Sequence, residues 1–236
     1  MGDSAYSRRY VTLIASCLTG DDVDWDIDIK EQLELMSQAL CQWRKHMDNF
    51  SYEYPYGTNW DFFSFGHCLE APTLSSNRSN FIQGDFYRSE ESYYIYPDST
   101  VLPPDQQTET NRKVLSAFGV PPGNRVLSRG KQPICIMGYG VTLEGAQRLL
   151  YHFSLDRLGG PLDVEIMVAC DNRSLRCLEV NPALIGVYRA PGPWGKVSDI
   201  MASTDPHAIH DGDNPMGPRS VQRQIRDKWS RLPGPI

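Results

Sequence analysis

Four acidic residues lie close together near the start of the chain: Asp21, Asp22, Asp24 and Asp26. Carboxylates this close repel one another, so several of them need a cation or a basic partner to stay ionised. A hard divalent ion, Mg2+ or Mn2+, binds carboxylate oxygen and can share a phosphate group of a ligand. The alternative is a solvated acidic turn that caps a helix beginning at Ile29. The acids alone do not decide between these two interpretations.

The acidic cluster follows an apolar run, Val11 to Leu18, that ends at a Thr-Gly turn. Such a run bounded by a turn is typical of a buried strand, and open α/β sheets bind ligands at the carboxyl ends of their strands. After the cluster, the apolar residues from Ile29 to Met47 recur every three or four positions, which predicts one helix. The pattern therefore predicts a strand and a helix that together position the acids.

A second buried strand is predicted over Trp60 to Cys68, after a turn marked by Pro55 and Gly57. His67 lies at the end of this strand, where it can face the same pocket as the aspartates. A histidine at a strand end can equally be a hydrogen-bonded structural residue.

Residues 71–132 are polar and show little periodicity, which predicts a long loop or lid. Order returns with a strand predicted over Ile134 to Val141, followed by a helix with Thr142 as its N-cap. A short helix over Leu162 to Cys170, capped near Asp163, precedes a last strand over Leu175 to Val180. This order of strands and helices predicts an α/β domain.

From about Ser203 the chain is rich in proline and glycine, which predicts a polar tail over residues 203–236. Within this tail Val221, Ile225 and Trp229 share one helical face, and the neighbouring residues are basic. We expect a short basic amphipathic helix that either lies on the domain or docks on a partner or membrane surface.

The composition is that of an ordinary globular protein, with 40% hydrophobic and 22% charged residues among 236. The net charge of −6 argues against a nucleic-acid-binding protein. No apolar run approaches the roughly 20 residues of a membrane span. The first ten residues and the apolar run after them imitate a signal peptide, but Thr12 and Ser16 interrupt that run, so no targeting signal is expected.

Four blocks of sequence occur in a familiar order: GDDVDWDIDIKEQL, YPYGTNWDFFSFGHC, CIMGYGVTLEGAQRLL and VNPALIGVYRAPGPWGKVSDI. Together they resemble glycosyltransferase family 25, which includes lipopolysaccharide-biosynthesis and procollagen galactosyltransferases, and the likeness is closest to the fungal branch. The resemblance covers Val11 to about Ile200, so we expect a domain over residues 11–202 between a leader, 1–10, and the tail.

The resemblance implies a GT-A-like (Rossmann-like) mixed α/β sheet flanked by helices. It also implies transfer of a sugar, galactose in the first instance, from a UDP-sugar donor to a hydroxyl of a glycan or protein acceptor. The family's acidic motif is Glu-Asp-Asp, whose last acid binds Mn2+ (or Mg2+). That role falls to Asp22, with Asp21 in the middle position and Gly20 in place of the glutamate. Asp24 is a candidate to compensate for the lost carboxylate.

An acceptor hydroxyl needs a general base within hydrogen-bond reach. Asp163 matches the family's acid ahead of the short cysteine-ending helix, so the resemblance makes it the candidate base, with Glu165 behind it; a helix N-cap is the alternative role. The family's closing Ser-Asp-Ile falls on Ser198 and Asp199, which are expected to contact substrate; capping a turn is the alternative role of Asp199. Further candidates for the substrate pocket are Trp60 and His67.

The lumenal relatives imply disulfides between Cys68 and Cys135 and between Cys170 and Cys177. By the same resemblance the protein belongs in the secretory lumen, Golgi or endoplasmic reticulum, although without a targeting signal the cytoplasm stays open. Family members begin with another strand–helix region, for which this chain offers only the ten residues MGDSAYSRRY.

We therefore expect an N-terminally truncated domain whose donor binding is weakened. Two alternatives to a metal-dependent glycosyltransferase remain. One is a non-catalytic remnant or binding module, which the missing region and Gly20 favour. The other is a metal-dependent hydrolase, which the lack of a His-Glu-x-x-His motif disfavours.

Overall fold

The computed structural model of the chain describes residues 23–45, 59–67, 93–130, 133, 135–156, 159–187 and 219–229. Its strands are β1 (Val23–Trp25), β2 (Phe62–Gly66), β3 (Tyr94–Pro97), β4 (Asn124–Arg129), β5 (Gly138–Val141), β6 (Cys177–Asn181) and β7 (Ile185–Val187). Its helices are α1 (Ile29–Lys45), α2 (Glu109–Ala117), α3 (Leu143–Leu150), α4 (Leu162–Asp171) and α5 (Val221–Trp229), with a 3-10 turn η1 (Pro104–Gln106) and a π-helical turn η2 (Tyr151–Asp156).

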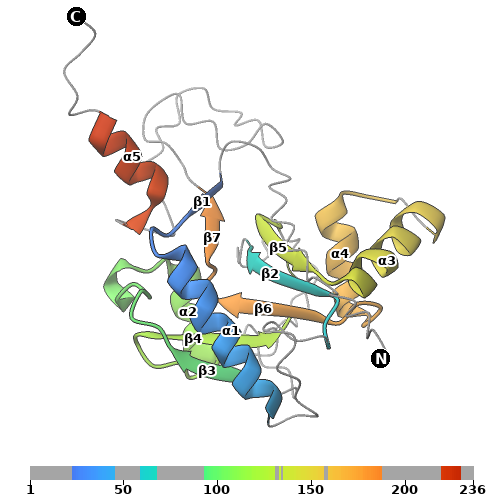
Figure 1. Cartoon of the computed structure of the whole chain (residues 1–236), viewed down its shortest axis with the longest axis horizontal. Helices are drawn as coiled ribbons and strands as arrows, with labels where there is room; N and C mark the ends of the chain where they lie inside the picture. Colours follow the sequence, from blue (N-terminus) through green and yellow to red (C-terminus); the bar gives the residue numbers. More distant parts are fainter. Residues whose placement is uncertain are drawn as a thin grey trace, which may run out of the picture.

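Five of these strands form a mixed sheet in the order β3-β4-β6-β2-β5. β2 and β6 run parallel at its centre, and the other neighbouring pairs are antiparallel. β1 and β7 form a separate antiparallel ribbon, with α5 beside it, at one end of the sheet (Figure 1). The chain is therefore a mixed α/β protein in its described part.

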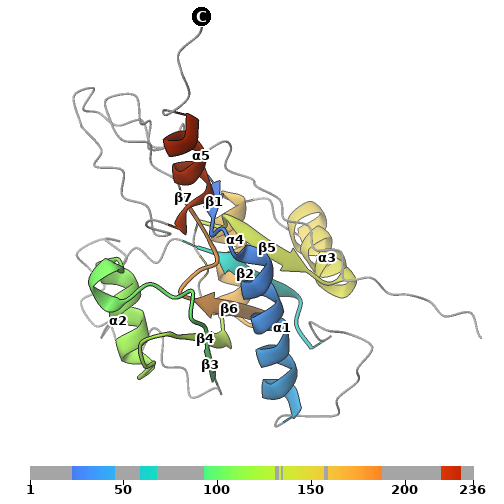
Figure 2. The same cartoon turned by 60° about the vertical axis from the view of Figure 1, so that its left-hand side comes forward.

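Helix α1 covers one face of the sheet. Its buried residues Met36 and Leu40 belong to the same apolar cluster as Phe63 and Phe65 of β2. The helix forms because its apolar side chains recur at helical spacing and so share one face. Figure 2 shows α1 lying against the sheet on the side away from α4.

Two smaller apolar clusters lie elsewhere against the sheet. One joins Phe62 of β2 to Ile166 of α4, and the other joins Val126 of β4 to Val114 and Phe118 at α2. Because side chains alternate along a strand, Phe62 points to the face opposite Phe63. The face opposite α1 therefore has one apolar cluster at the β2 side and another at the β4 side.

A disulfide and a buried ion pair fasten the two ends of β6. Cys170 of α4 is bonded to Cys177, the first residue of β6. Past the other end, the Arg125 guanidinium donates to the Pro182 carbonyl at 2.5 Å and to the Asp98 carboxylate at 2.5 Å. Arg125 and Asp98 are both buried, and the pKa of Asp98 is lowered from its ordinary value; burial raises it, but Arg125 and hydrogen bonds from Thr100 outweigh burial.

Several expectations from the sequence are confirmed. Helix α1 begins at Ile29 as predicted, and the predicted strand after Trp60 is β2. Thr142 is the N-cap of α3, with its hydroxyl accepting from Gly145 N at 3.0 Å. The pairing of Cys170 with Cys177 is also confirmed, whereas the other expected disulfide involves Cys68, which lies outside the described residues.

Three predictions of element bounds need correction. The irregular loop predicted over 71–132 is wrong for residues 93–130, which contain β3, α2 and β4. The polar residues of β4, Arg125 and Ser128, face buried acidic partners, so the strand lacks the apolar alternation that would have shown it. Strand β5 begins only at Gly138, after Cys135 with a φ of 54°. The N-cap of α4 is Pro161, two residues before Asp163, so Asp163 is not itself the capping residue.

The strand predicted over 11–18, the leader 1–10 and all of the tail except 219–229 lie outside the described residues. Within the part that the structure describes, no helix is both long enough and apolar enough to cross a membrane.

Helix α3 begins in direct contact with the backbone of Asp61, the residue directly ahead of β2. A Cβ placed on Gly145 would lie 2.0 Å from the carbonyl oxygen of Asp61, which is far inside van der Waals contact. Thr142 N also donates to that same carbonyl oxygen at 3.2 Å. Only glycine lets the first turn of α3 approach this closely.

We therefore predict that Gly145→Ala destabilises the protein by about 2 kcal/mol or more, because the clash with backbone exceeds the roughly 1 kcal/mol that alanine gains in helix propensity. Urea unfolding measures the change. Gln147→Ala, at an exposed position of the same helix, is the matched control and is expected to stay within about 0.5 kcal/mol of the parent. An equal or higher midpoint for Gly145→Ala would contradict the close approach.

Candidate functional site

A row of polar side chains crosses the centre of the sheet on the face opposite α1. The register pairs Glu179 of β6 with Ser64 of β2 on one side and with Ser128 of β4 on the other. Paired residues on neighbouring strands point to the same face. Ser64 follows Phe62 by two positions, so this row lies between the two small apolar clusters.

Two more polar residues extend the row at the carboxyl ends of the parallel strands. Asn181 is the last residue of β6 and shares the face of Glu179. Gly66 faces Ile185, which packs with the α1 core, because a Cβ there would lie 2.9 Å from the Ile185 Cβ. His67 comes next in the chain, just past the end of β2, and its imidazole lies at hydrogen-bonding distance from the Val180 carbonyl of β6.

We call these five residues, Ser64, His67, Ser128, Glu179 and Asn181, the β6 polar cluster. Their exposed fractions are only 0, 6, 3, 7 and 1%. Buried polar groups cost free energy unless each finds a hydrogen-bonding partner. The hydrogen bonds of this cluster therefore decide what it can do.

Glu179 carries the one carboxyl group of the cluster. Burial raises its pKa from 4.5 to about 7, although the nearby Ser128 hydroxyl and Asn181 amide lower it. The Ser128 hydroxyl donates to Glu179 Oε1 at 3.1 Å. The Asn181 amide is close enough to affect that pKa, yet neither of its atoms makes a hydrogen bond of acceptable length and angle. A carboxyl with a pKa near 7 can both give and take a proton at neutral pH.

The His67 imidazole is neutral at neutral pH. Its Nε2 lies 3.3 Å from the Val180 carbonyl oxygen, and since a carbonyl only accepts, Nε2 carries the proton. Burial lowers the His67 pKa to about 4, outweighing the hydrogen bond to Val180. Nδ1 is therefore a bare acceptor, and it is buried with no hydrogen-bond partner.

The β1–β7 ribbon brings the acidic segment to the end of β2. Strand β7 crosses the sheet where β2 ends: Ile185 contacts both Gly66 and Gly138. Residues Val23–Trp25 pair with β7, so Asp24 lies near the carboxyl ends of β2 and β6. Ligands of open α/β sheets bind at this end of the strands.

The acids of this segment have protein partners. The Ser220 hydroxyl donates to Asp24 Oδ2, and Trp25 N donates to Asp24 Oδ1 at 2.9 Å. The Arg219 guanidinium donates to Asp26 at 2.8 Å and also to Asp28. These pairs fasten the start of α5 to the end of β1.

These partners bear on the expected metal site. Asp24 is fully buried and both of its carboxylate oxygens accept hydrogen bonds, and Asp26 likewise accepts from Arg219 and from Asp28 N. No group of three metal-ligating side chains occurs among the residues that the structure describes. In this arrangement Asp24 and Asp26 do not fit Mn2+ or Mg2+, whereas Asp21 and Asp22 lie outside the described residues.

The remaining predicted site residues are dispersed. Asp163 and Glu165 lie in the first turn of α4, where the Asp163 carboxylate accepts from Val164 N at 2.9 Å. Trp60 is 1% exposed and packs edge-on to Phe63 in the α1 core, so it is not available to contact substrate. Of the predicted pocket residues, His67 alone lies in the β6 polar cluster. Ser198 and Asp199 lie outside the described residues.

Sequence reasoning missed Glu179, Asn181 and Ser128. The signal was present in the segment Leu-Glu-Val-Asn-Pro, where an acid and an amide two positions apart share one face of a strand that otherwise has apolar residues. Polar side chains on a buried strand need hydrogen-bonding partners. The partner of Glu179 is Ser128, which lies in the region that the sequence analysis interpreted as a loop.

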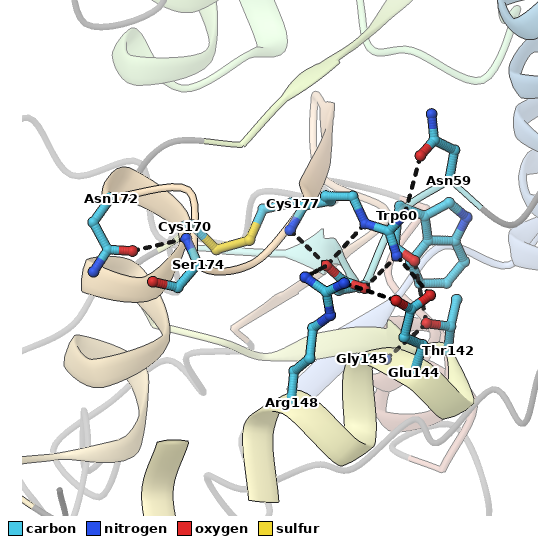
Figure 3. A network of polar contacts seen from close by, with 12 residues as sticks. Asn59, Trp60, Thr142, Glu144, Gly145, Arg148, Cys170, Asn172, Ser174 and Cys177 are labelled. Carbon is cyan, nitrogen blue, oxygen red and sulfur yellow. Dashed lines mark hydrogen bonds and ion pairs between the residues drawn. A yellow bond between two sulfur atoms is a disulfide. The ribbon is translucent and has the colours of Figure 1, made fainter. Parts of the chain in front are cut away.

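A clamp of charged residues fixes the opposite, amino-terminal ends of β2 and β6. Asp61 is fully buried and accepts from Arg176 at three atoms, N (2.8 Å), Nε (3.0 Å) and Nη2 (2.7 Å). Arg176 also reaches Glu144 of α3 at 3.0 Å, and Arg148 lies 3.7 Å from Asp61 (Figure 3). The pKa of Asp61 is lowered from its ordinary value; burial raises it, but the hydrogen bonds and charge of Arg176 outweigh burial.

Comparison with known proteins adds no relative. No protein-family profile, no curated protein and no solved structure matches this chain.

We predict that Asp61→Asn lowers the free energy of unfolding at pH 7 by about 3 kcal/mol. This is the lower end of the range for breaking a buried ion pair, because Arg176 is 33% exposed. Denaturant unfolding at pH 7 measures the loss. Glu144→Gln, which removes the exposed acid of the same clamp, is the matched control and is expected to change the midpoint little. Equal midpoints for both variants would show that the clamp does not depend on Asp61.

The β6 polar cluster predicts opposing pH dependences of stability. In the folded protein Glu179 keeps a proton that the unfolded chain releases above pH 4.5. Its contribution to the free energy of unfolding therefore falls as the pH rises to about 7. In the folded protein His67 stays unprotonated at pH values below 6.5, where the unfolded chain binds a proton. Its contribution to the free energy of unfolding therefore rises with pH from about 4 to 6.5. In the parent the two effects cancel over most of this window.

Replacing one of these two residues should leave the pH dependence of the other visible. Relative to the parent, Glu179→Gln is expected to gain stability with rising pH across this window, and His67→Gln to lose it, each by about 1 kcal/mol per pH unit. Thermal or urea unfolding between pH 4.5 and 7 gives the slopes. Parallel curves for all three proteins would mean that neither pKa is displaced.

Proposed function

We propose that this chain is a glycosyltransferase domain of the family 25 kind, with a GT-A-like sheet, that transfers a sugar from a UDP-sugar donor to a hydroxyl of a glycan or protein acceptor. The four ordered sequence blocks support the family, and galactose is the first donor sugar to test. The mixed α/β sheet with a central parallel pair is compatible with this proposal.

The observation that carries the proposal is the meeting of polar groups at one edge of the sheet. The ribbon of β1 and β7 brings the acidic segment to the carboxyl ends of β2 and β6, where the β6 polar cluster also lies. Ligand sites of open α/β sheets occur at this edge because loops and strand ends converge there.

The chemistry required is a displacement at the anomeric carbon of the donor. The acceptor hydroxyl loses a proton as its oxygen attacks, and the diphosphate leaves with growing negative charge. The described acids near β1 do not fit a divalent cation, so no role in this step is assigned to one. Asp163 and Glu165 remain candidates for the base through their match to the family motif.

The disulfide between Cys170 and Cys177 supports a location in the secretory lumen as part of the same proposal, because disulfides persist in oxidising compartments.

A second candidate function is a non-catalytic binding module derived from the same family. The contacts of Arg219 and Ser220 favour it, because they occupy acids that would otherwise be open to a cation or a substrate. In that case the chain would bind a sugar or nucleotide without transferring it.

UDP binding tests the proposal. A ligand that binds only the folded state stabilises it by about 2.7 kcal/mol at 100 times its Kd. We predict that UDP, tested with and without Mn2+, raises the thermal midpoint by about 5 °C or more, given the 2–4 °C per kcal/mol typical of domains this size. Equal concentrations of ADP control for nonspecific phosphate binding.

A flat response to UDP in both conditions would contradict nucleotide-sugar binding. UDP release from UDP-galactose, assayed in the parent beside Asp22→Asn, then separates transfer from binding alone. Binding without turnover would favour the non-catalytic module.

A further inference from the structure

We propose that Asn172 is an N-glycosylation site, at which the side-chain amide nitrogen carries an oligosaccharide. Asn172, Arg173 and Ser174 form the triplet Asn-x-Ser, which marks acceptor asparagines in secreted proteins. Two further triplets begin at Asn49 and Asn77, which lie outside the described residues. Such a short motif also occurs by chance, so the inference depends on where the fold places the triplet.

The fold places Asn172 in an accessible turn. Asn172 is the C-cap of α4 and lies in the short connection from α4 to β6. Asn172 and Arg173 are exposed, and Ser174 is half-buried. An N-linked glycan is bulky and needs a position on the surface. An oligosaccharide on Asn172 therefore fits without any change in the packing of α4 against the sheet.

Hydrogen bonds orient the Asn172 amide for this role. Its Oδ1 accepts from Ser174 N at 2.8 Å, which closes an Asx turn (Figure 3). Arg173 has a φ of 65°, so the chain reverses direction directly after the helix. The carbonyl side of the amide is thus held against the backbone, whereas Nδ2 makes no hydrogen bond to the described part of the chain. Nδ2 is the atom that bonds to the sugar in an N-glycan.

A disulfide encloses the same triplet. Cys170 and Cys177 are bonded to each other, and Asn172–Ser174 lies in the loop between them. Disulfides form and persist in the endoplasmic reticulum and outside the cell. Asparagine glycosylation is a modification of proteins that enter the same secretory compartment. The covalent bond and the triplet therefore point independently to one cellular environment.

The exposed side of α4 gives the glycan a physical use. Val164 and Val168 are 40% and 46% exposed. They precede Asn172 at four-residue spacing, so the three residues follow one side of the helix. Asn172 N donates to the Val168 carbonyl oxygen at 3.0 Å, which keeps Asn172 at the end of this row. A hydrophilic oligosaccharide on Asn172 lies beside exposed apolar side chains and hinders their association with other apolar surfaces.

The reaction is the transfer of an oligosaccharide from a polyprenyl diphosphate by the transferase of the secretory lumen. A bond forms between Asn172 Nδ2 and the anomeric carbon of the first sugar. One N–H bond of the amide breaks, and its proton goes to a base of that transferase. The bond from the anomeric carbon to the diphosphate breaks, and its electron pair leaves on the diphosphate oxygen.

The test uses the full chain, expressed in a eukaryotic cell behind a cleavable secretory signal. Peptide N-glycosidase removes an N-glycan and converts the asparagine that carried it to aspartate. We expect mass spectrometry to find this conversion at Asn172, with ¹⁸O incorporated when the digestion is done in H2¹⁸O. The peptide that contains Asn172 is analysed by itself, so glycans at Asn49 or Asn77 do not affect the result.

Two variants of Ser174 separate modification from a structural role of Asn172. Ser174→Ala removes the triplet but keeps the Asn172 side chain and its hydrogen bond, because the donor is the backbone N of residue 174. We expect this variant to lose the glycan at Asn172. Ser174→Thr preserves the triplet and is the matched control, in which the glycan is expected to remain.

An unmodified Asn172 in chains from which the signal has been removed would overturn the inference, because signal removal shows that these chains entered the lumen. A glycan that persists on Asn172 in Ser174→Ala would also overturn it. Both results concern a modification of the chain and not its activity. UDP binding and sugar transfer are measured separately, so failure of this inference is distinguishable from failure of the proposed function.

Discussion

The parallel alignment of β2 with β6 is the constraint on which the other features depend. Parallel neighbours cannot be joined by a tight turn, so no hairpin fixes their register and contacts at their ends help to hold it. Asp61, directly ahead of β2, accepts three hydrogen bonds from Arg176, directly ahead of β6. A fully buried carboxylate tolerates no loss of these donors, because an unpaired charge in the interior is costly.

The clamp also reaches the elements that pack on the sheet. Glu144 of α3 shares Arg176, and the disulfide between Cys170 and Cys177 joins α4 to the residue after Arg176 (Figure 3). The amino ends of the parallel pair are thereby held by charge, by a covalent bond and by the close approach of α3.

At the carboxyl ends the same register gathers polar groups in place of apolar ones. Glu179 is flanked by Ser64 and Ser128 only because β6 pairs with β2 and β4 in this alignment; a shift by one residue would place Leu178 there and turn Glu179 into the α1 core. The β6 polar cluster and the acidic segment differ in one important respect. Asp24 and Asp26 are satisfied by Ser220 and Arg219, whereas His67 and Asn181 keep unpaired atoms.

The sequence by itself determined the elements whose local patterns are strong. The spacing of apolar residues after Ile29 predicted α1, Thr142 marked the start of α3, and the apolar run after Trp60 marked β2. These signals are local, because helix periodicity and capping depend on residues within one or two turns. Only the tertiary structure showed β3 and β4, since their buried polar residues depend on partners far along the chain, such as Glu179 for Ser128. The same reason explains the candidate site: His67 was visible as a histidine at a strand end, but the displaced pKa of Glu179 arises from burial, and burial is a property of the folded chain alone.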